Sequence, residues 1–430
     1  MKHENVARQM KKLFSGLQTY EKADYAALMF IAASMPIAWQ LGMWGMIILS
    51  IITLWGIFKS RQTALSHISK RQMTGYLLLI LFFVVYLLSG WTSENQSYGW
   101  HTTTGKLSFL IFPLIFIFGN RQYLDGKRIR SLFYVLWAVI IVRFSIAAIK
   151  VALGLVNGVP LSDMMEENFI GIHHSYISLY ATVAATFAYS ELMQLLKSKK
   201  WSAKGWWLLA GCIPLVLTTV MVNSRAGMLF MAILLAIALC DIAVTQKKIL
   251  QASAILAITL IAGLAIYQVI PQPYKRFTYA INEIRAGRSG DCRPLMIRSG
   301  LEVASLKPIF GYGSGDYEEP LQQQFLKNGF QEGYDRKFGS HNQFIETLLE
   351  CGGIGLAVLV AMLFYPIGIL WRRQRRFAIT TILAVATALF FESILGRQMG
   401  ILFVSYLYCL MIFSSQHGLS PETAKRNQNG

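Results

Sequence analysis

Long apolar runs alternate with short polar segments along the 430 residues of the chain. A helix needs roughly 20 apolar residues to cross the hydrocarbon core of a bilayer. Runs of about this length recur about twelve times, at approximately 23–39, 41–58, 74–90, 106–119, 131–153, 176–196, 206–222, 227–245, 249–270, 346–370, 377–395 and 399–415. The pattern predicts an all-α membrane protein with about twelve transmembrane helices.

The polar segments between these runs differ in charge in a regular way. Clusters of Lys and Arg occupy every second connection, at 59–71, 121–130, 197–204, 247–248, 372–376 and 425–426, and they also occupy the N-terminal segment. The intervening connections are polar, short or acidic. Because Lys and Arg keep short loops on the cytoplasmic side, we expect both chain ends to be cytoplasmic. The first run follows residues 1–22 without a small-residue cleavage pattern, which predicts an uncleaved anchor.

One connection is much longer than the others and falls on the opposite, outer face. Connections of this length usually carry function or secondary structure of their own, so we expect short helices in it. The predicted organisation is therefore a cytoplasmic segment (1–22), nine transmembrane helices (23–270), a large periplasmic loop (271–343), three further transmembrane helices (344–415) and a cytoplasmic tail (416–430).

Composition excludes several other classes of protein. Hydrophobic residues make up 54% of the chain and charged residues only 14%, against about 25% charged in soluble domains. The net charge of +18 lies in clusters between apolar runs, whereas nucleic-acid binders gather basic residues into a patch. The five cysteines form neither a CxxC pair nor a Cys/His metal spacing. We therefore expect membrane lipids but no nucleic acid as a partner, and no metal or other cofactor.

A polar segment at the end of the long loop contains the first candidate catalytic residue, His341. Ser340 and Gln343 have the spacing of a capping box, which predicts that a helix begins there with His341 in its first turn. The positive end of the helix dipole would favour neutral imidazole, which can accept a proton from a hydroxyl. The alternative is a histidine that only helps to cap the helix.

Two arginines are candidates for binding an anion at the same face. Pro294 suits the first position of a helix, so Arg293 is predicted at a helix N-terminus, where phosphate groups bind readily. Arg225 lies in a very short outer turn, where the rule of positive cytoplasmic loops does not call for a charge. Its alternative role is to extend towards lipid head groups.

Other candidates are weaker. Gly311 and Gly313 could allow the backbone to approach a ligand closely, or they could form a plain turn. His174 and Tyr176 belong to a polar segment at the start of the sixth predicted span. Arg143 and Lys150 are charges within a span and are functional candidates by default.

Missing motifs narrow the chemistry further. The sequence has no GxxxxGK[ST], DxD or HExxH motif, so nucleotide hydrolysis, metal-dependent use of nucleotide sugars and zinc proteolysis have no support. A reaction at the outer face of a cell membrane needs a substrate that is already activated. Lipid pyrophosphates are the usual form of such a substrate.

The spacing of these motifs resembles the O-antigen ligase and polymerase superfamily of polytopic bacterial membrane proteins. The resemblance is carried by Arg293, the segments 308–313, 341–345 and 352–355, and Ser224–Arg225 upstream. It implies a metal-independent, inverting transfer of a glycan from undecaprenyl pyrophosphate to an acceptor hydroxyl, a sugar of the lipid A core for ligases, at the periplasmic face of the inner membrane.

On this resemblance, the expected catalytic residues are His341, Arg293 and Arg225. The arginines would stabilise the departing pyrophosphate and His341 would position or deprotonate the acceptor hydroxyl. The expected substrate-binding residues are Arg288, Arg298, Asn342, His174, Tyr176, Gly311 and Gly313.

Two alternatives remain open at this stage. Within the superfamily, the chain could be an O-antigen polymerase or a protein O-oligosaccharyltransferase. From another class, a polytopic transporter or lipid flippase would also have about twelve spans. The charges of Arg143 and Lys150 favour this second alternative.

Overall fold

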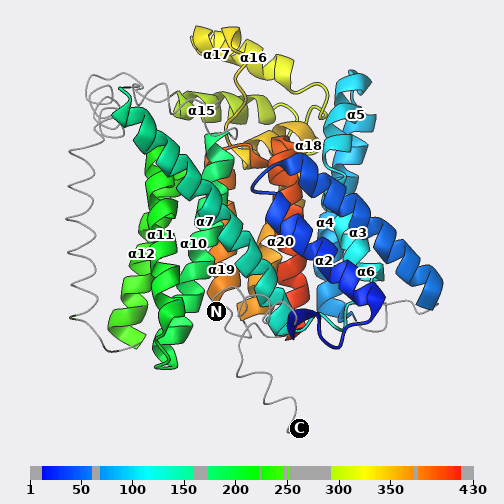
Figure 1. Cartoon of the computed structure of the whole chain (residues 1–430). Helices are drawn as coiled ribbons and strands as arrows, with labels where there is room; N and C mark the ends of the chain where they lie inside the picture. Colours follow the sequence, from blue (N-terminus) through cyan, green and yellow to red (C-terminus); the bar gives the residue numbers. More distant parts are fainter. Residues whose placement is uncertain are drawn as a thin grey trace.

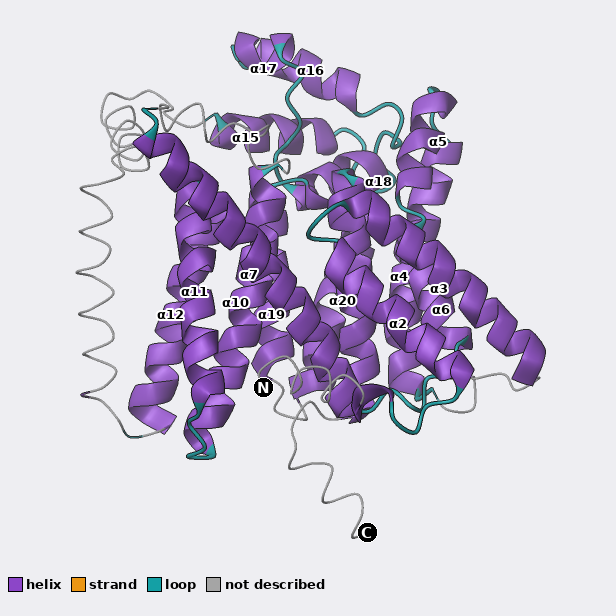
Figure 2. Cartoon of the chain, in the orientation of Figure 1, coloured by secondary structure: helices purple, strands orange, loops and turns teal. Residues whose placement is uncertain are grey.

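The computed structural model describes residues 12–60, 68–158, 173–222, 224–245, 247, 250, 292–371 and 376–417. Every regular element in these ranges is helical (Figure 2). The elements are α2 (Thr19–Ser34), α3 (Trp39–Ser60), α4 (Lys70–Trp91), α5 (Gln96–Gly105), α6 (Ser108–Phe118), α7 (Gly126–Val156), α10 (His174–Lys197), α11 (Ala203–Met221), α12 (Arg225–Cys240), the π-helix η2 (Asp241–Thr245), α15 (Arg293–Ala304), α16 (Glu318–Lys327), α17 (Gln331–Asp335), α18 (Gln343–Trp371), α19 (Arg376–Phe391), the 3-10 turn η3 (Ile394–Gly396) and α20 (Gln398–His417).

The helices form a bundle with a layer over one end. The long apolar helices run side by side, while α15, α16 and α17 lie across the end at which α18 begins (Figure 1). We call this end the covered end. The long loop predicted at 271–343 thus contains three short helices in its described part, as expected.

Eight described helices are long and apolar enough to cross a membrane. The expectation of about twelve spans is not shown by the structure. α2 and α19 have only 16 residues each. α10 has 24 residues but is not among the eight candidate spans. The predicted span at 249–270 lies outside the described residues. The predicted short span at 106–119 is part of a longer one, in which α5 and α6 together run from Gln96 to Phe118.

A buried ion pair fixes the bundle at the end opposite the α15–α17 layer. Arg121 donates from Nη2 to Oδ1 of Asp24 at 2.7 Å, and both side chains are fully buried. The same Nη2 donates to Thr53 at 3.1 Å, which connects α2, α3 and the turn after α6. Breaking a buried pair leaves an uncompensated charge, so Arg121 has a structural role in addition to its place in a basic connection.

A break in α18 connects the layer to the bundle. Gly352 has φ 65° and ψ −164°, so the helix is interrupted there. The segment 308–313 fills the break: Tyr312 and Gly313 donate their backbone N–H groups to the carbonyls of Leu349 and Glu350 at 2.8 and 3.1 Å. In return Gly353 donates to the carbonyl of Pro308 at 2.7 Å. The segment thereby satisfies backbone groups that an interrupted helix leaves unpaired.

The layer also has a hydrophobic core of its own. Met296 and Val303 of α15 pack with Phe325 of α16 against Ile345 and Leu349 of α18, and all five are buried. Because α18 belongs both to this core and to the bundle, the N-terminus of α15 is held at a fixed place above the bundle.

Candidate active site

His341 lies immediately before α18, and the predicted capping pattern is wrong in detail. The helix begins at Gln343, and its cap is Asn342, whose Oδ1 accepts from the N–H groups of Phe344 and Ile345 at 2.9 and 3.2 Å. Ser340 instead donates to the carbonyl of Asn342, and Gln343 accepts from the backbone of Leu395. Asparagine caps helices as well as serine does. The helix cap is therefore Asn342, two residues after Ser340, the cap that the Ser340–Gln343 spacing predicts.

This cap holds His341 in an unusual backbone conformation. Its φ is 47°, in the left-handed region that non-glycine residues rarely adopt. Asn342 is buried and also donates from Nδ2 to the carbonyl of Phe390 at 2.9 Å, which ties the start of α18 to the end of α19. Asn342 was expected to bind substrate, and this stays a prediction; its observed hydrogen bonds position the start of α18. Strained conformations of this kind persist where the surroundings fix them, and they are concentrated at functional sites.

The imidazole of His341 is paired with a carboxylate that follows α19. Nδ1 of His341 lies 2.8 Å from Oε1 of Glu392, and the two side chains are 33% and 15% exposed. When Nδ1 carries the proton and donates a hydrogen bond to Glu392, Nε2 is unprotonated and can act as an acceptor. This is the arrangement in which a carboxylate orients a histidine that acts as a base.

The pair also shifts both pKa values. The hydrogen bond to Glu392 raises the pKa of His341 above its usual 6.5, although burial and the charge of Arg293 oppose the shift. Burial alone would raise the pKa of Glu392, but its hydrogen bond to His341 and the charge of that histidine lower it to about 2. The expected bias of His341 towards the neutral form, based on the helix dipole, is therefore wrong in sign, because the nearby carboxylate outweighs it.

Arg225 and Arg293 line one small cavity beneath the layer, and Glu392 lines it too. The cavity has a volume of about 110 Å³, and we call it the cationic cavity. Its walls are the first residues of three helices: His174, Ser175 and Ser178 of α10, Ser224, Arg225 and Ala226 at α12, and Arg293 of α15. Ala388, Phe391, Glu392 and Ile394, at and after the end of α19, complete it.

Each of these N-termini carries the positive end of a helix dipole and backbone N–H groups. The prediction that Arg293 stands at a helix start, followed by a proline at the first turn, is confirmed. Arg225 likewise begins α12, after Ser224, whose hydroxyl accepts from the N–H of Gly227 at 3.2 Å. The first residues of three helices and two arginines line one cavity together with the carboxylate of Glu392, and the excess of positive groups makes it suitable for an anion.

Two further predicted residues lie near this cavity. His174 lines it, and its role in substrate binding stays a prediction. Tyr176 follows His174 by two residues on α10 and is buried. Its hydroxyl donates to the carbonyl of Ile394 at 3.3 Å. Tyr176 thus supports the segment after Glu392 and does not line the cavity.

The other predicted binding residues lie elsewhere. Arg298 is 70% exposed and donates to Glu302 one turn along α15 at 2.8 Å. Gly311 and Gly313 belong to the segment that fills the break in α18; a Cβ on Gly311 would come within 2.6 Å of the Gly352 nitrogen. This packing accounts for the glycine at 311 without a ligand. Arg288 lies outside the described residues.

The charges that favour a transporter are also separate from the cationic cavity. Arg143 donates from Nη1 to the carbonyl of Ile37 at 2.5 Å. Lys150 is exposed near the end of α7. Neither residue lines this cavity.

Glu392 is an important site residue that was not among the residues predicted for catalysis or substrate binding. It is recognisable in the sequence as a charge near the outer end of an apolar run, and such charges are functional candidates. Its pairing with a histidine 51 residues away becomes visible only when α18 and α19 are placed side by side. Among the described residues, no group of three or more His, Cys, Asp or Glu side chains could hold a metal ion.

These features define a class: a multi-pass helical membrane protein with a cavity lined by two arginines beside a histidine–carboxylate pair. Residues 210–360 match the family model described as O-antigen ligase. The matched range includes Arg225, Arg293 and His341. No curated protein sequence matches the chain significantly.

Proposed function

We propose that the protein is an O-antigen ligase-like glycosyltransferase that acts at the periplasmic face of the bacterial inner membrane. It moves a glycan from undecaprenyl pyrophosphate to an acceptor hydroxyl, which for a ligase belongs to a sugar of the lipid A core. The covered end of the bundle is then periplasmic, and both chain ends are cytoplasmic. The observation that carries the proposal is that Arg225, Arg293 and Glu392 line one cavity, and that Glu392 also holds the imidazole of His341, which is not itself among the lining residues.

The cationic cavity binds the pyrophosphate in this proposal. Two guanidinium groups and three helix N-termini can each interact with phosphate oxygens. Negative charge accumulates on the pyrophosphate as it departs, so donors fixed around it stabilise the transition state more than the ground state. This stabilisation comes from side chains and backbone, and the proposed step does not use a metal ion.

His341 acts on the acceptor. Nε2 takes the proton of the acceptor hydroxyl while its oxygen forms a bond to the anomeric carbon. The bond between that carbon and the pyrophosphate oxygen breaks, and the electron pair leaves with undecaprenyl pyrophosphate. Attack from the face opposite the leaving group inverts the anomeric configuration. Glu392 holds Nδ1–H and stabilises the imidazolium that forms.

The test is transfer of lipid-linked glycan in purified membranes. His341→Ala and Arg293→Ala proteins should lose nearly all transfer, whereas Arg298→Ala should retain it because Arg298 is exposed and paired with Glu302. All variants must be inserted at the wild-type level. Turnover at the wild-type rate by His341→Ala and Arg293→Ala would refute the assignment.

A second experiment separates a ligase from a polymerase. A strain that lacks a ligase should accumulate finished polymer on the carrier lipid, whereas a strain that lacks a polymerase should show single repeat units on the core. Gel analysis of surface and carrier-linked glycan distinguishes the two patterns.

A further inference from the structure

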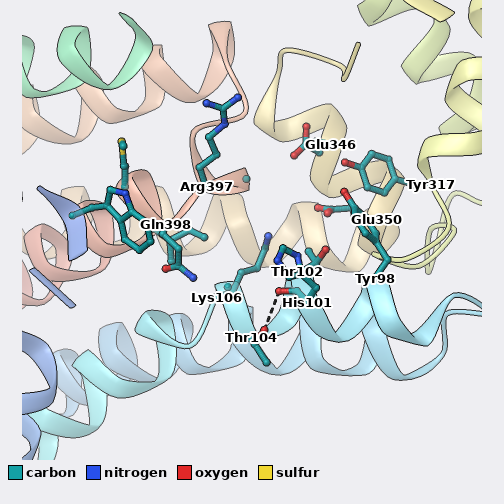
Figure 3. A pocket seen from close by; sticks show the side chains of 15 residues that line it. Tyr98, His101, Thr102, Thr104, Lys106, Tyr317, Glu346, Glu350, Arg397 and Gln398 are labelled. Atoms are coloured by element: carbon teal, nitrogen blue, oxygen red, sulfur yellow. Dashed lines mark hydrogen bonds between the residues drawn. The ribbon is translucent and has the colours of Figure 1, made fainter. Parts of the chain in front are cut away.

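A second and larger cavity lies on the other side of the segment 392–397. Its volume is about 460 Å³, within the range of about 300–1,000 Å³ common for small-molecule sites. We call it the acidic cavity. Its lining is Trp39, Tyr98, His101, Thr102, Thr104, Gly105, Lys106, Tyr317, Glu346, Glu350, Gly396, Arg397, Gln398, Met399 and Ile401. Figure 3 shows these side chains between α5, α18 and the start of α20.

Two buried carboxylates in this cavity have an oxygen without a hydrogen bond from the protein. Glu346 and Glu350 stand one turn apart on α18 and are only 7% and 2% exposed. Oε2 of Glu350 accepts from the hydroxyl of Tyr86 at 2.5 Å, and Oε2 of Glu346 accepts from the hydroxyl of Ser393. In the described part of the chain neither Oε1 atom has a hydrogen-bond donor. Neither Oε1 is among the fully buried unpaired atoms of the described residues, so both atoms are open to the cavity and can accept hydrogen bonds from a ligand.

The charge of the cavity is mixed. Lys106 is 2% exposed, its Nζ lies 4.1 Å from the centre of the Tyr86 ring, and Figure 3 shows it on the same side of α5 as the carboxylates. Its one hydrogen bond, to the carbonyl of Leu395, is 3.3 Å long. Lys106 and Arg397 balance the two carboxylates, so the cavity has no excess charge to compensate a charged ligand and suits a neutral one.

Aromatic rings complete this set of groups. Trp39, Tyr98 and Tyr317 line the cavity, and the hydroxyl of Tyr98 is fixed by donation to Glu318 at 2.6 Å. Flat apolar rings beside fixed hydrogen-bond acceptors suit a ring-shaped ligand with apolar faces and hydroxyls around its edge. A pyranose sugar has this shape.

The cavity is also next to the proposed reaction centre. Glu392 and Ile394 line the cationic cavity, whereas Gly396 and Arg397 line the acidic one. Ser393, which donates to Glu346, is adjacent in sequence to the partner of His341. The two cavities therefore lie on opposite sides of one short segment that begins with Glu392.

We propose that the acidic cavity binds the terminal sugar of the acceptor, and that this sugar is neutral. The inference rests on the proposed function, and it separates the two substrates by charge. The pyrophosphate of the donor binds where cations converge, and acceptor hydroxyls bind Glu346 and Glu350. A uronic acid or a phosphorylated sugar would bring a charge that the balanced cavity does not compensate, and it is disfavoured.

The first test measures binding without turnover. The full-length protein in lipid nanodiscs is mixed with methyl glucoside or methyl glucuronide, and saturation-transfer NMR detects the bound sugar. A Cβ at Gly105 would meet only the Gln398 side chain, at 3.5 Å, so Gly105→Leu fills the cavity without displacing backbone. Ser97→Leu is the matched control, because Ser97 is exposed on the same helix and does not line the cavity.

The glucoside should bind to the wild type and to Ser97→Leu, and about tenfold more weakly or not at all to Gly105→Leu, which occupies the space in front of the carboxylates. The glucuronide should bind much more weakly than the glucoside. Equal binding of both sugars, or full binding by a folded Gly105→Leu protein, would overturn the proposal. Thermal unfolding of each variant establishes that it is folded.

The second test uses the transfer reaction and separates the two sources of sugar. Gly105→Leu and Glu350→Gln should raise the KM for the acceptor about tenfold while leaving the KM for the donor unchanged. A rise in the donor KM alone would assign the cavity to the donor glycan and overturn the proposal. If the wild type transfers no glycan at all, the proposed function fails, while the binding test still decides whether the cavity takes a neutral sugar.

Discussion

His341 and Glu392 are 51 residues apart in sequence, and their side chains meet at 2.8 Å because one precedes α18 and the other follows α19. The chain leaves the covered end along α18 and returns to it along α19. The pair therefore depends on the lengths of two helices and not on a local motif. The same hydrogen bond determines both the orientation of the imidazole and its affinity for protons.

The first prediction concerns the pH dependence of transfer. Glu392 raises the pKa of His341 above 6.5, and a base must be neutral to accept a proton. The kcat of the wild type should therefore fall as the pH is lowered through a value above 6.5. Glu392→Gln removes the negative charge, so this acid limb should move to lower pH, and kcat at high pH should fall about 10²-fold as the orientation of His341 is lost. A pH–rate profile of both proteins measures the shift; an unchanged acid limb would contradict it.

The second prediction concerns the two arginines. Arg225→Ala and Arg293→Ala should each lower kcat/KM for the donor by about 10²–10³-fold, as expected for loss of one fixed donor to a developing anion. Because both line one cavity, the double variant should lose less than the product of the two single effects. Kinetics of the four proteins with a common donor test this coupling. Fully multiplicative effects would show that the two arginines act at separate places.

The third prediction concerns Asn342. Asn342→Ala removes two hydrogen bonds to the first turn of α18 and one to Phe390, and should lower the free energy of unfolding by about 1–2 kcal/mol. Because His341 then loses its fixed conformation, kcat should fall while the KM for the donor stays constant. Asn342→Asp keeps the acceptor for the helix N–H groups but loses the donor to Phe390, so it should recover only part of the stability. Denaturation in detergent and steady-state kinetics provide the two measurements, and a rise in donor KM would indicate a direct contact with substrate instead.

The fourth prediction concerns the break in α18. A Cβ on Gly352 would lie 2.2 Å from the carbonyl oxygen of Ile309, and φ is 65° there. Gly352→Ala should therefore destabilise the protein by more than about 2 kcal/mol. Gly368→Ala in the same helix meets no atom within 4 Å and should change stability by no more than about 1 kcal/mol. Thermal unfolding of the two variants compares them directly. Equal stability would show that the segment 308–313 can move away from the new Cβ without lowering the free energy of unfolding.

The bundle helices were well predicted because each needs a long apolar run, and the described helices follow those runs. The number of membrane spans was harder to predict from the sequence. α10 was predicted as the span at 176–196, but it contains Ser, Thr and Tyr at many positions and is not among the eight helices apolar enough to cross a membrane. The joint span of α5 and α6 begins with the polar sequence Gln96–Gly105, which hydrophobicity alone assigns to a loop.

The site was predictable only in part, for a related reason. Arg293 could be placed from Pro294, since this signal is local. The role of Asn342 depends on Phe390 and that of Gly311 on the break at Gly352, and no pattern near either residue reveals these partners. Glu346 and Glu350 look like ordinary polar positions at the start of a span until α5 and Tyr317 are placed against them.

The backbone hydrogen bonds between the segment 308–313 and α18 have an evolutionary consequence. They use no side-chain atoms, so exposed side chains in this region, such as Leu306 and Phe310, can be exchanged freely without moving the layer. Substitutions at these positions should therefore change the surface that the layer presents to a glycan while leaving Arg293 on the layer at the same place relative to His341 at the start of α18.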